Sequence, residues 1–176
     1  MTLKDITMHS NTQQAFSLIE LLVVVVLLGL MSLIALPAFT SLLLQTQEET
    51  MRHELDAALN HARMQAILNR RVVELCPFGT EGICTQDWNN GWQSHFLDDP
   101  KTALRRHQPK QSVTLYWTGF SKSIRFNPNG TSPLSNGRFI QCRAQKVSWQ
   151  LVINRQGRIR VASSEENHDQ RQRCAQ

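Results

Sequence analysis

Apolar residues are concentrated in one block near the start of the chain. Most positions from Phe16 to Leu44 are aliphatic or aromatic, and the run from Leu21 to Leu36 is interrupted only by Gly29 and Ser32. A helix of this length crosses about 30 Å of hydrocarbon at ~1.5 Å per residue, and glycine and serine are tolerated there. Pro37 lacks a backbone donor, so we expect it to kink the helix or to break its ladder locally. The pattern predicts a membrane or packing helix over residues 16–44.

The helical pattern continues beyond this block with a different character. From Thr46 to Asn69 apolar residues recur every three or four positions, with charged residues between them. This spacing gathers the apolar side chains on one helix face. We therefore expect an amphipathic continuation of the helix over residues 45–70, with a stripe formed by Met51, Leu55, Leu59, Ala62 and Ala66.

After residue 70 the hydrophobic period shortens toward two. Short β-branched and aromatic segments alternate with clusters of Gly, Pro and Asn: RVVELC, DWNNGW, SVTLYWTG, SIRFNPNG, RFIQCRA and VSWQLVINRQGRIRVAS. Such segments are typical of antiparallel strands, and NRQG has the composition of a hairpin turn. The sequence predicts an α+β fold, with a long N-terminal helix packed on an antiparallel β-sheet domain over residues 71–163. Residues 1–15 are expected to be a polar leader and residues 164–176 a mobile polar tail.

One acid interrupts the apolar block. A charge such as Glu20 costs roughly 3 kcal/mol at the centre of a bilayer, so it needs a partner or must reach the headgroups. A cleaved secretory signal is another explanation of the apolar run, but such a signal begins with a positive charge, and here Lys4 is cancelled by Asp5.

Charge is distributed unevenly along the chain. Residues 1–100 carry a net charge of −6 and residues 101–176 a net charge of +11, which together give the overall +5. A strongly basic half favours an anionic partner, such as nucleic acid or an acidic membrane surface. The alternative is a solvated basic surface without a ligand.

All four cysteines follow the apolar block. An even number of cysteines outside the cytoplasm indicates two disulfides, and four cysteines allow three pairings. The loop between Cys76 and Cys84 contains Pro77, Gly79 and Gly82, which favours closure of that loop and leaves Cys142 to pair with Cys174. A zinc site is the alternative, although the sequence has no CxxC pair.

No catalytic motif stands out. The sequence has no HExxH, Walker loop or GxSxG, so we expect no enzyme and no cofactor. His53 and His61 lie eight positions apart on the amphipathic helix and are expected to face solvent. The tryptophans have the chemistry to stack on bases, but packing in the core is expected for Trp88, Trp92, Trp117 and Trp149.

The apolar block resembles a known N-terminus. FSLIELLVVVVLLGLMSLIALP is similar to the start of type IV pilins and pseudopilins. The resemblance implies that a prepilin peptidase cleaves between Ala15 and Phe16 and methylates the new amine. Ala15 stands where the family normally has glycine. Glu20 matches the family's acidic residue, which implies that in a filament it faces the Phe16 amine of a neighbouring chain.

The resemblance extends into the second half of the chain. The order VVELCPFGTEGICTQDWNNGW, SIRFNPNG and GRIR is similar to the GspH/FimT branch of minor pilins and pseudopilins. FimT-like members carry a basic GRxR motif linked to DNA binding, and Gly157, Arg158 and Arg160 match it. In an extended strand the two arginines lie on one face about 6.7 Å apart. Arg155 and Arg143 are expected to extend this surface, with Lys146 and Arg138 as weaker candidates.

The resemblance implies a minor pilin of a type IV pilus that binds extracellular DNA, through the phosphate backbone and without sequence preference, during natural transformation. Its expected partners are DNA, other pilins and the prepilin peptidase. The chain would sit in the inner membrane with a periplasmic domain and enter an extracellular pilus on assembly. The alternatives are a pseudopilin of a type II secretion system, an assembly-priming minor pilin without DNA binding, and a plain membrane-anchored periplasmic domain.

Overall fold

The computed structural model describes residues 17–78, 83–109 and 114–175. The chain divides into two compact units, Met1–Leu44 and Gln45–Gln176. A single helix, α1 (Leu18–Asn69), contributes to both units.

The first unit contains the N-terminal part of α1. The helix begins after Ser17, whose hydroxyl accepts a hydrogen bond from the backbone N–H of Glu20 at 3.2 Å. Its large apolar side chains up to Leu44 are exposed, and α1 is long and apolar enough to cross a membrane on length and composition. The helix continues through Pro37, so this proline removes one backbone donor without ending the helix.

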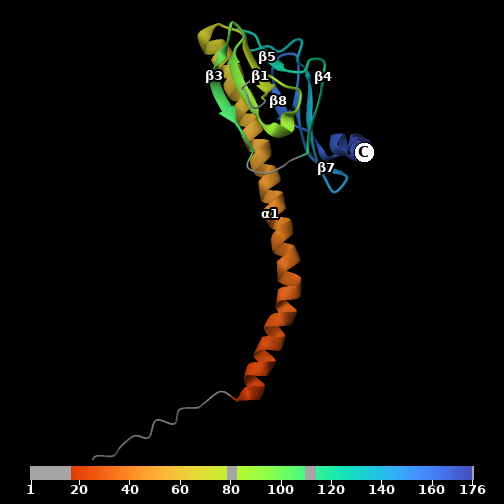
Figure 1. The fold of residues 1–176 in the computed structure, drawn as a ribbon. Helices are drawn as coiled ribbons and strands as arrows, with labels where there is room; N and C mark the ends of the chain where they lie inside the picture. The colour runs from red at the N-terminus through yellow and green to blue at the C-terminus, as the bar shows by residue number, and fades with distance from the viewer. Residues whose placement is uncertain (1–16, 79–82, 110–113, 176) are drawn as a thin grey trace, which may run out of the picture. The chain divides into compact units, whose positions relative to one another are not determined.

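The second unit begins with the amphipathic part of α1, and the predicted stripe is confirmed. Its five apolar residues are buried, together with Ala58. They pack against buried residues of both sheets, including Trp92, Phe126 and Leu151. Figure 1 shows this part of α1 lying against the strands.

In the described part of the chain, eight strands form two antiparallel sheets, which confirms the predicted α+β class (Figure 1). The first sheet has the order β3-β2-β1-β5 and the second the order β4-β6-β7-β8. The strands are β1 (Val73–Pro77), β2 (Trp92–Phe96), β3 (Asp99–His107), β4 (Leu115–Gly119), β5 (Ile124–Phe126), β6 (Gly137–Arg143), β7 (Lys146–Ile153) and β8 (Ile159–Val161).

Two features of the strands differ from the sequence-based expectation. The strands form two sheets, whereas the pattern predicted only an antiparallel arrangement, because alternation does not reveal which strands pair. Strand β3 was missed altogether. It is an edge strand with mostly exposed side chains, so DPKTALRRH carries no apolar alternation.

The C-terminal tail is folded, which corrects the expectation of a mobile segment. Helix α2 (Ser164–Asp169) follows β8, and a short 3-10 helix (Arg171–Cys174) comes next. Ser163 and Glu166 form a capping box, in which each side chain binds the other residue's backbone N–H. The Cys142–Cys174 disulfide then fastens the end of the tail to β6.

Aromatic residues fill the core of the second unit as expected. Trp88, Trp92 and Trp149 are buried. Trp117 is partly buried, and its indole N–H donates to the Ser121 carbonyl at 2.6 Å. These rings therefore do not form an exposed stacking platform.

Candidate functional site

The hairpin between β7 and β8 carries the basic motif. Asn154 organises the turn, because its carbonyl accepts the Gly157 N–H at 2.9 Å and its side-chain oxygen accepts the Arg158 N–H at 2.9 Å. Arg155 and Gln156 form the exposed tip. The predicted turn NRQG is confirmed, and it is fixed by backbone hydrogen bonds.

Gly157 has a structural role in this turn. It is buried with a φ of +73°, and a Cβ at this position would lie 2.1 Å from the Gly130 carbonyl oxygen. That carbonyl also accepts a hydrogen bond from Arg63 Nε at 3.0 Å. Any residue with a side chain would therefore push the hairpin away from the Gly130 loop. The glycine of the motif shapes the turn, and the anion-binding chemistry falls to the arginines.

Two arginines of the hairpin are free. The side chains of Arg155 and Arg158 are exposed and make no hydrogen bond or ion pair to any residue in 17–78, 83–109 or 114–175. Arg155 also lines a shallow pocket of about 370 Å³ together with Asn136, Arg138 and Asn154. An anion reaching this surface meets guanidinium groups that no acid among the described residues neutralises.

Arg160 is placed differently from Arg158. Its two terminal nitrogens donate to the two carboxylate oxygens of Glu166 at 2.7 and 2.8 Å. This bidentate ion pair, with the Ser163 N–H, lowers the pKa of Glu166 to about 2. The Arg160 side chain remains 45% exposed. The sequence predicted two equivalent arginines on one strand face, whereas the folded tail supplies an acid to one of them.

Arg138 lies two strands from Arg160 in the second sheet. Strand register places Arg138 of β6 and Arg160 of β8 on opposite sides of Val152 of β7. Directly paired residues of antiparallel strands point to the same face, so both arginines emerge from one surface. The Arg138 guanidinium donates to Gln150 Oε1 at 3.2 Å. Arg138, which the sequence analysis gave less weight, thus shares a sheet face with Arg160 of the GRIR motif.

Arg143 lies at the other end of the sheet. It is five residues from Arg138 along β6, or about 17 Å in an extended strand. Its Nε contacts Glu48 Oε1 at 3.2 Å, and Lys146 is its partner across the β6–β7 turn. The expectation that Arg143 extends the hairpin surface is therefore wrong, because the antiparallel return of β7 separates the two ends.

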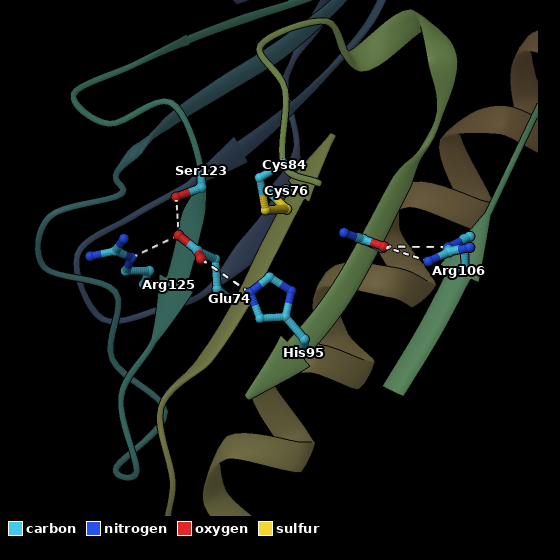
Figure 2. The surroundings of a disulfide bond; sticks show 8 residues. Glu74, Cys76, Cys84, His95, Arg106, Ser123 and Arg125 are labelled. Carbon is cyan, nitrogen blue, oxygen red and sulfur yellow. Dashed lines mark hydrogen bonds and ion pairs between the residues drawn. A yellow bond between two sulfur atoms is a disulfide. The ribbon is translucent and has the colours of Figure 1, made fainter. Parts of the chain in front are cut away.

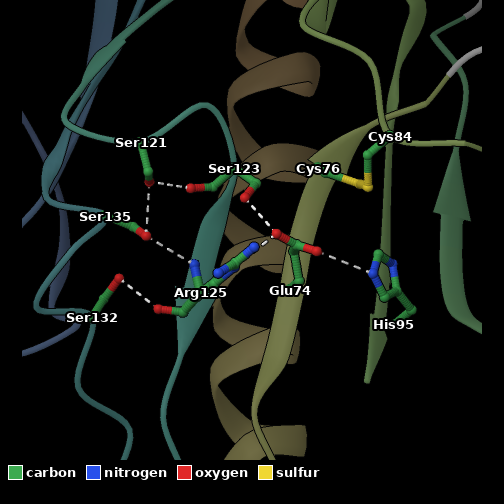
Figure 3. Close-up of polar contacts among 9 residues, drawn as sticks. All are labelled: Glu74, Cys76, Cys84, His95, Ser121, Ser123, Arg125, Ser132 and Ser135. Atoms are coloured by element: carbon green, nitrogen blue, oxygen red, sulfur yellow. Dashed lines mark hydrogen bonds and ion pairs between the residues drawn. A yellow bond between two sulfur atoms is a disulfide. The ribbon is translucent and has the colours of Figure 1, made fainter. Parts of the chain in front are cut away.

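A second polar cluster surrounds Glu74 in the first sheet. Glu74 lies on β1 directly between His95 of β2 and Arg125 of β5. Its carboxylate accepts from Arg125 Nε at 2.8 Å and from the Ser123 hydroxyl, and it contacts His95 Nε2 at 3.3 Å. Figure 3 shows these three side chains converging on the carboxylate. Burial opposes ionisation, but the His95, Ser123 and Arg125 contacts outweigh it and lower the pKa of Glu74 to about 2.

The two disulfides join Cys76 to Cys84 and Cys142 to Cys174, the pairing that the loop composition favoured. Cys76 is buried on β1, two residues from Glu74, whereas Cys84 is exposed. His95 lies next to the first disulfide (Figure 2). The expectation that His53 and His61 both face solvent is only half met, because His53 is exposed but His61 is partly buried.

The N-terminal processing residues are covered only in part. Ala15 and Phe16 lie outside the described residues. Glu20 lies in the first turn of α1 with an exposed side chain, and no partner within residues 17–78, 83–109 or 114–175 contacts its carboxylate.

The comparison with protein families decides the identity of the chain. The family model described as type II transport protein GspH matches residues 52–157. The chain belongs to this GspH family. The prokaryotic N-terminal methylation motif matches residues 10–36, which include Ala15, Phe16 and Glu20. Arg158, Arg160 and helix α2 lie beyond the GspH match.

Comparison with solved structures agrees with the family match. Two crystal structures of the type IV minor pilin FimU from Pseudomonas aeruginosa are similar to this chain, at 26% identity with a TM-score of 0.54 and at 24% with a TM-score of 0.55. They cover 66% of this chain and 89% and 94% of FimU. The comparison with curated proteins gives no match. The resemblance to the GspH/FimT family is confirmed, and this GspH-type protein is a minor pilin or pseudopilin of the type IV pilus or type II secretion class.

Sequence reasoning missed the acids that control the arginines. Glu166 lies in the segment expected to be a mobile polar tail, although Ser163 and Glu166 have the S-x-x-E spacing of a capping box and that signal predicts a helix start. No comparable signal marks Glu74, because its contacts depend on the register of three strands.

Proposed function

We propose that this GspH-type protein is a minor pilin of a type IV pilus that binds extracellular DNA through its β7–β8 hairpin during natural transformation. The observation that carries the proposal is a pair of exposed arginines, Arg155 and Arg158, whose side chains have no partner in the described part of the chain, on a turn held by Asn154 and Gly157. Guanidinium groups bind phosphate oxygens through paired hydrogen bonds.

The proposed site recognises the phosphate backbone and does not read bases. Its contacting groups are cations on an exposed turn and an edge strand, which suit phosphates in register along a strand. Arg138 and Arg160 add to the local potential, but Glu166 cancels part of it. DNA of arbitrary sequence is the ligand that such a surface fits.

The N-terminal helix supplies the assembly function in this proposal. Cleavage between Ala15 and Phe16 creates an amine that pairs with Glu20 of a neighbouring subunit, which offsets the cost of a carboxylate in an apolar bundle. Before assembly the chain resides in the inner membrane with its second unit in the periplasm. After assembly the second unit is displayed on an extracellular pilus.

A purely structural role is the second candidate. The family description, type II transport protein, favours a pseudopilin of a type II secretion system. A minor pilin that primes assembly without binding DNA is the other form of this structural role. In either role the ion pair between Arg160 and Glu166 stabilises the tail, and the free arginines have no ligand.

Salt-dependent binding of duplex DNA to the full chain in detergent micelles tests the DNA-binding proposal. Each phosphate contact contributes about 0.9 to the slope of log affinity against log salt concentration. We expect Arg155→Gln with Arg158→Gln to reduce the slope by about 1.8. The control is Lys101→Gln with Arg105→Gln, which removes the same charge from exposed positions on β3 of the other sheet. Equal slopes for the parent and both double variants would show that the hairpin is not the site.

A further inference from the structure

The cluster around the first disulfide has chemistry that the proposed function does not use. The sulfurs of Cys76 and Cys84 and one ring nitrogen of His95 all lie within 4.8 Å of one another. Two sulfurs and an imidazole are a ligand set that soft and borderline metal ions prefer. Figure 3 shows the His95 ring beside the disulfide, with a dashed line from one ring nitrogen to Glu74.

His95 has a nitrogen without a hydrogen-bonding partner. Its side chain is 3% exposed, and Nε2 faces Glu74. Nδ1 is buried and has no hydrogen bond within the described part of the chain. Since Glu74 accepts from Ser123 and Arg125, its carboxylate acts as an acceptor toward His95 as well, so Nε2 carries the proton. The lone pair of a neutral imidazole then remains on Nδ1, where a buried acceptor without a partner is unusual.

We propose that the dithiol form of this protein binds one zinc-like cation through the sulfurs of Cys76 and Cys84 and Nδ1 of His95. The fourth coordination position is open to water, because Cys84 is exposed. Glu74 is the positioning residue, since a carboxylate that accepts the second ring N–H of a histidine fixes the orientation of a metal ligand. The sequence lacked a CxxC pair, and the sheet register supplies the third ligand in its place.

Metal and disulfide exclude each other at this site. A dithiol reductant breaks the Cys76–Cys84 bond, becomes a disulfide itself, and transfers two electrons and two protons to the two sulfurs. The cation then displaces both thiol protons and forms two metal–sulfur bonds and one metal–nitrogen bond. Tetrahedral zinc has Zn–S distances of about 2.3 Å and Zn–N distances of about 2.0 Å, so the two sulfurs must separate from bonding distance as the three ligand atoms close around the cation.

Cobalt binding to the full chain in detergent micelles tests this proposal. The protein is reduced anaerobically with a phosphine, which becomes a phosphine oxide with oxygen from water, and Co²⁺ is added as a probe for zinc. We expect one Co²⁺ per chain with a thiolate-to-cobalt charge-transfer band, and displacement of Co²⁺ by Zn²⁺. The oxidised protein should show no band. Glu74→Gln, measured under conditions where circular dichroism shows native secondary structure, should weaken binding about 10- to 100-fold.

Two cysteine variants separate this site from the other disulfide. Cys142→Ser with Cys174→Ser should keep the band, whereas Cys76→Ser with Cys84→Ser should lose it. His95→Gln should abolish tight equimolar binding while both thiols remain. The proposal is overturned if the reduced parent gives no band, if the band survives loss of Cys76 and Cys84, if His95→Gln binds as tightly as the parent, or if the reduced chain unfolds and binds cobalt only in that state.

Discussion

The two sheets place charge on their inner strands in opposite ways. In the first sheet an acid, Glu74, lies between His95 and Arg125, and its carboxylate contacts both side chains across the strands. In the second sheet an apolar residue, Val152, lies between Arg138 and Arg160. The acid that reaches Arg160 comes from helix α2 and not from the sheet. The acid that pairs with an arginine thus belongs to the sheet in one case and to an added helix in the other, and Arg158 has no acid partner among the described residues.

The largest loss of stability is expected when Glu74, the acid at the centre of the first sheet's polar cluster, is replaced. Glu74→Gln removes the charge that Arg125 and His95 face while keeping the shape of the side chain. Breaking a buried ion pair costs about 3 to 5 kcal/mol, and since Arg125 is 51% exposed we expect about 3 kcal/mol. Denaturant unfolding followed by tryptophan fluorescence measures this loss, because Trp88, Trp92 and Trp149 are buried in the same unit.

An exposed acid provides the control for this variant. Glu165→Gln on α2 removes the same charge at an exposed position and should change the free energy of unfolding by less than about 0.5 kcal/mol. If Glu74→Gln were as mild as Glu165→Gln, the cluster would be a set of contacts without net stabilisation, and the contrast between the two sheets would lose its energetic basis.

Acid should weaken the first sheet through the same carboxylate. The pKa of Glu74 is lowered from 4.5 to about 2, so the folded state favours the ionised form. This contribution is fully present above about pH 4.5 and is lost as the pH falls toward 2. For a shift of this size the loss amounts to about 3 kcal/mol. Unfolding measured between pH 5 and pH 2 should show a steeper decline for the parent than for Glu74→Gln, and parallel curves would contradict the assignment to Glu74.

The contrast between the sheets also explains what the sequence could and could not predict. The stripe from Met51 to Ala66 and the NRQG turn follow from local periodicity and turn chemistry, and both were predicted. Strand register places Arg138 two strands from Arg160 on the same sheet face, and it places Arg143 about 17 Å from Arg138 along β6. Spacing along one strand says nothing about which residue lies opposite on the next. The signal for Glu166 was present in its S-x-x-E spacing, but the polarity of the tail concealed a helix.

A smaller effect, on DNA affinity, is expected when Arg160 is freed from its ion pair with Glu166. Glu166→Gln removes the carboxylate that binds the guanidinium but keeps a side chain that can complete the capping box with Ser163. Under the proposed function, Arg160 then becomes free for a phosphate. One charge-assisted hydrogen bond of about 1.5 kcal/mol corresponds to roughly tenfold tighter DNA binding at low salt. The salt slope should rise by about 0.9, and this gain should vanish when Arg160→Gln is added.

The smallest effect on DNA binding is expected from Arg143, at the far end of the second sheet. Arg143→Gln removes the same charge as Arg158→Gln, but Arg143 already pairs with Glu48 and lies well away from the hairpin turn. Glu48 keeps its hydrogen bond from the Ser148 hydroxyl, but its side chain is only 10% exposed, so loss of the arginine partner should cost about 1 to 3 kcal/mol of stability. The salt slope for DNA should fall by about 0.9 for Arg158→Gln and stay within error of the parent for Arg143→Gln. Equal reductions would mean that DNA responds to the total charge of the domain. A reduction confined to Arg158→Gln would mean that the absence of an acid partner, and not the number of arginines, defines where this protein binds DNA.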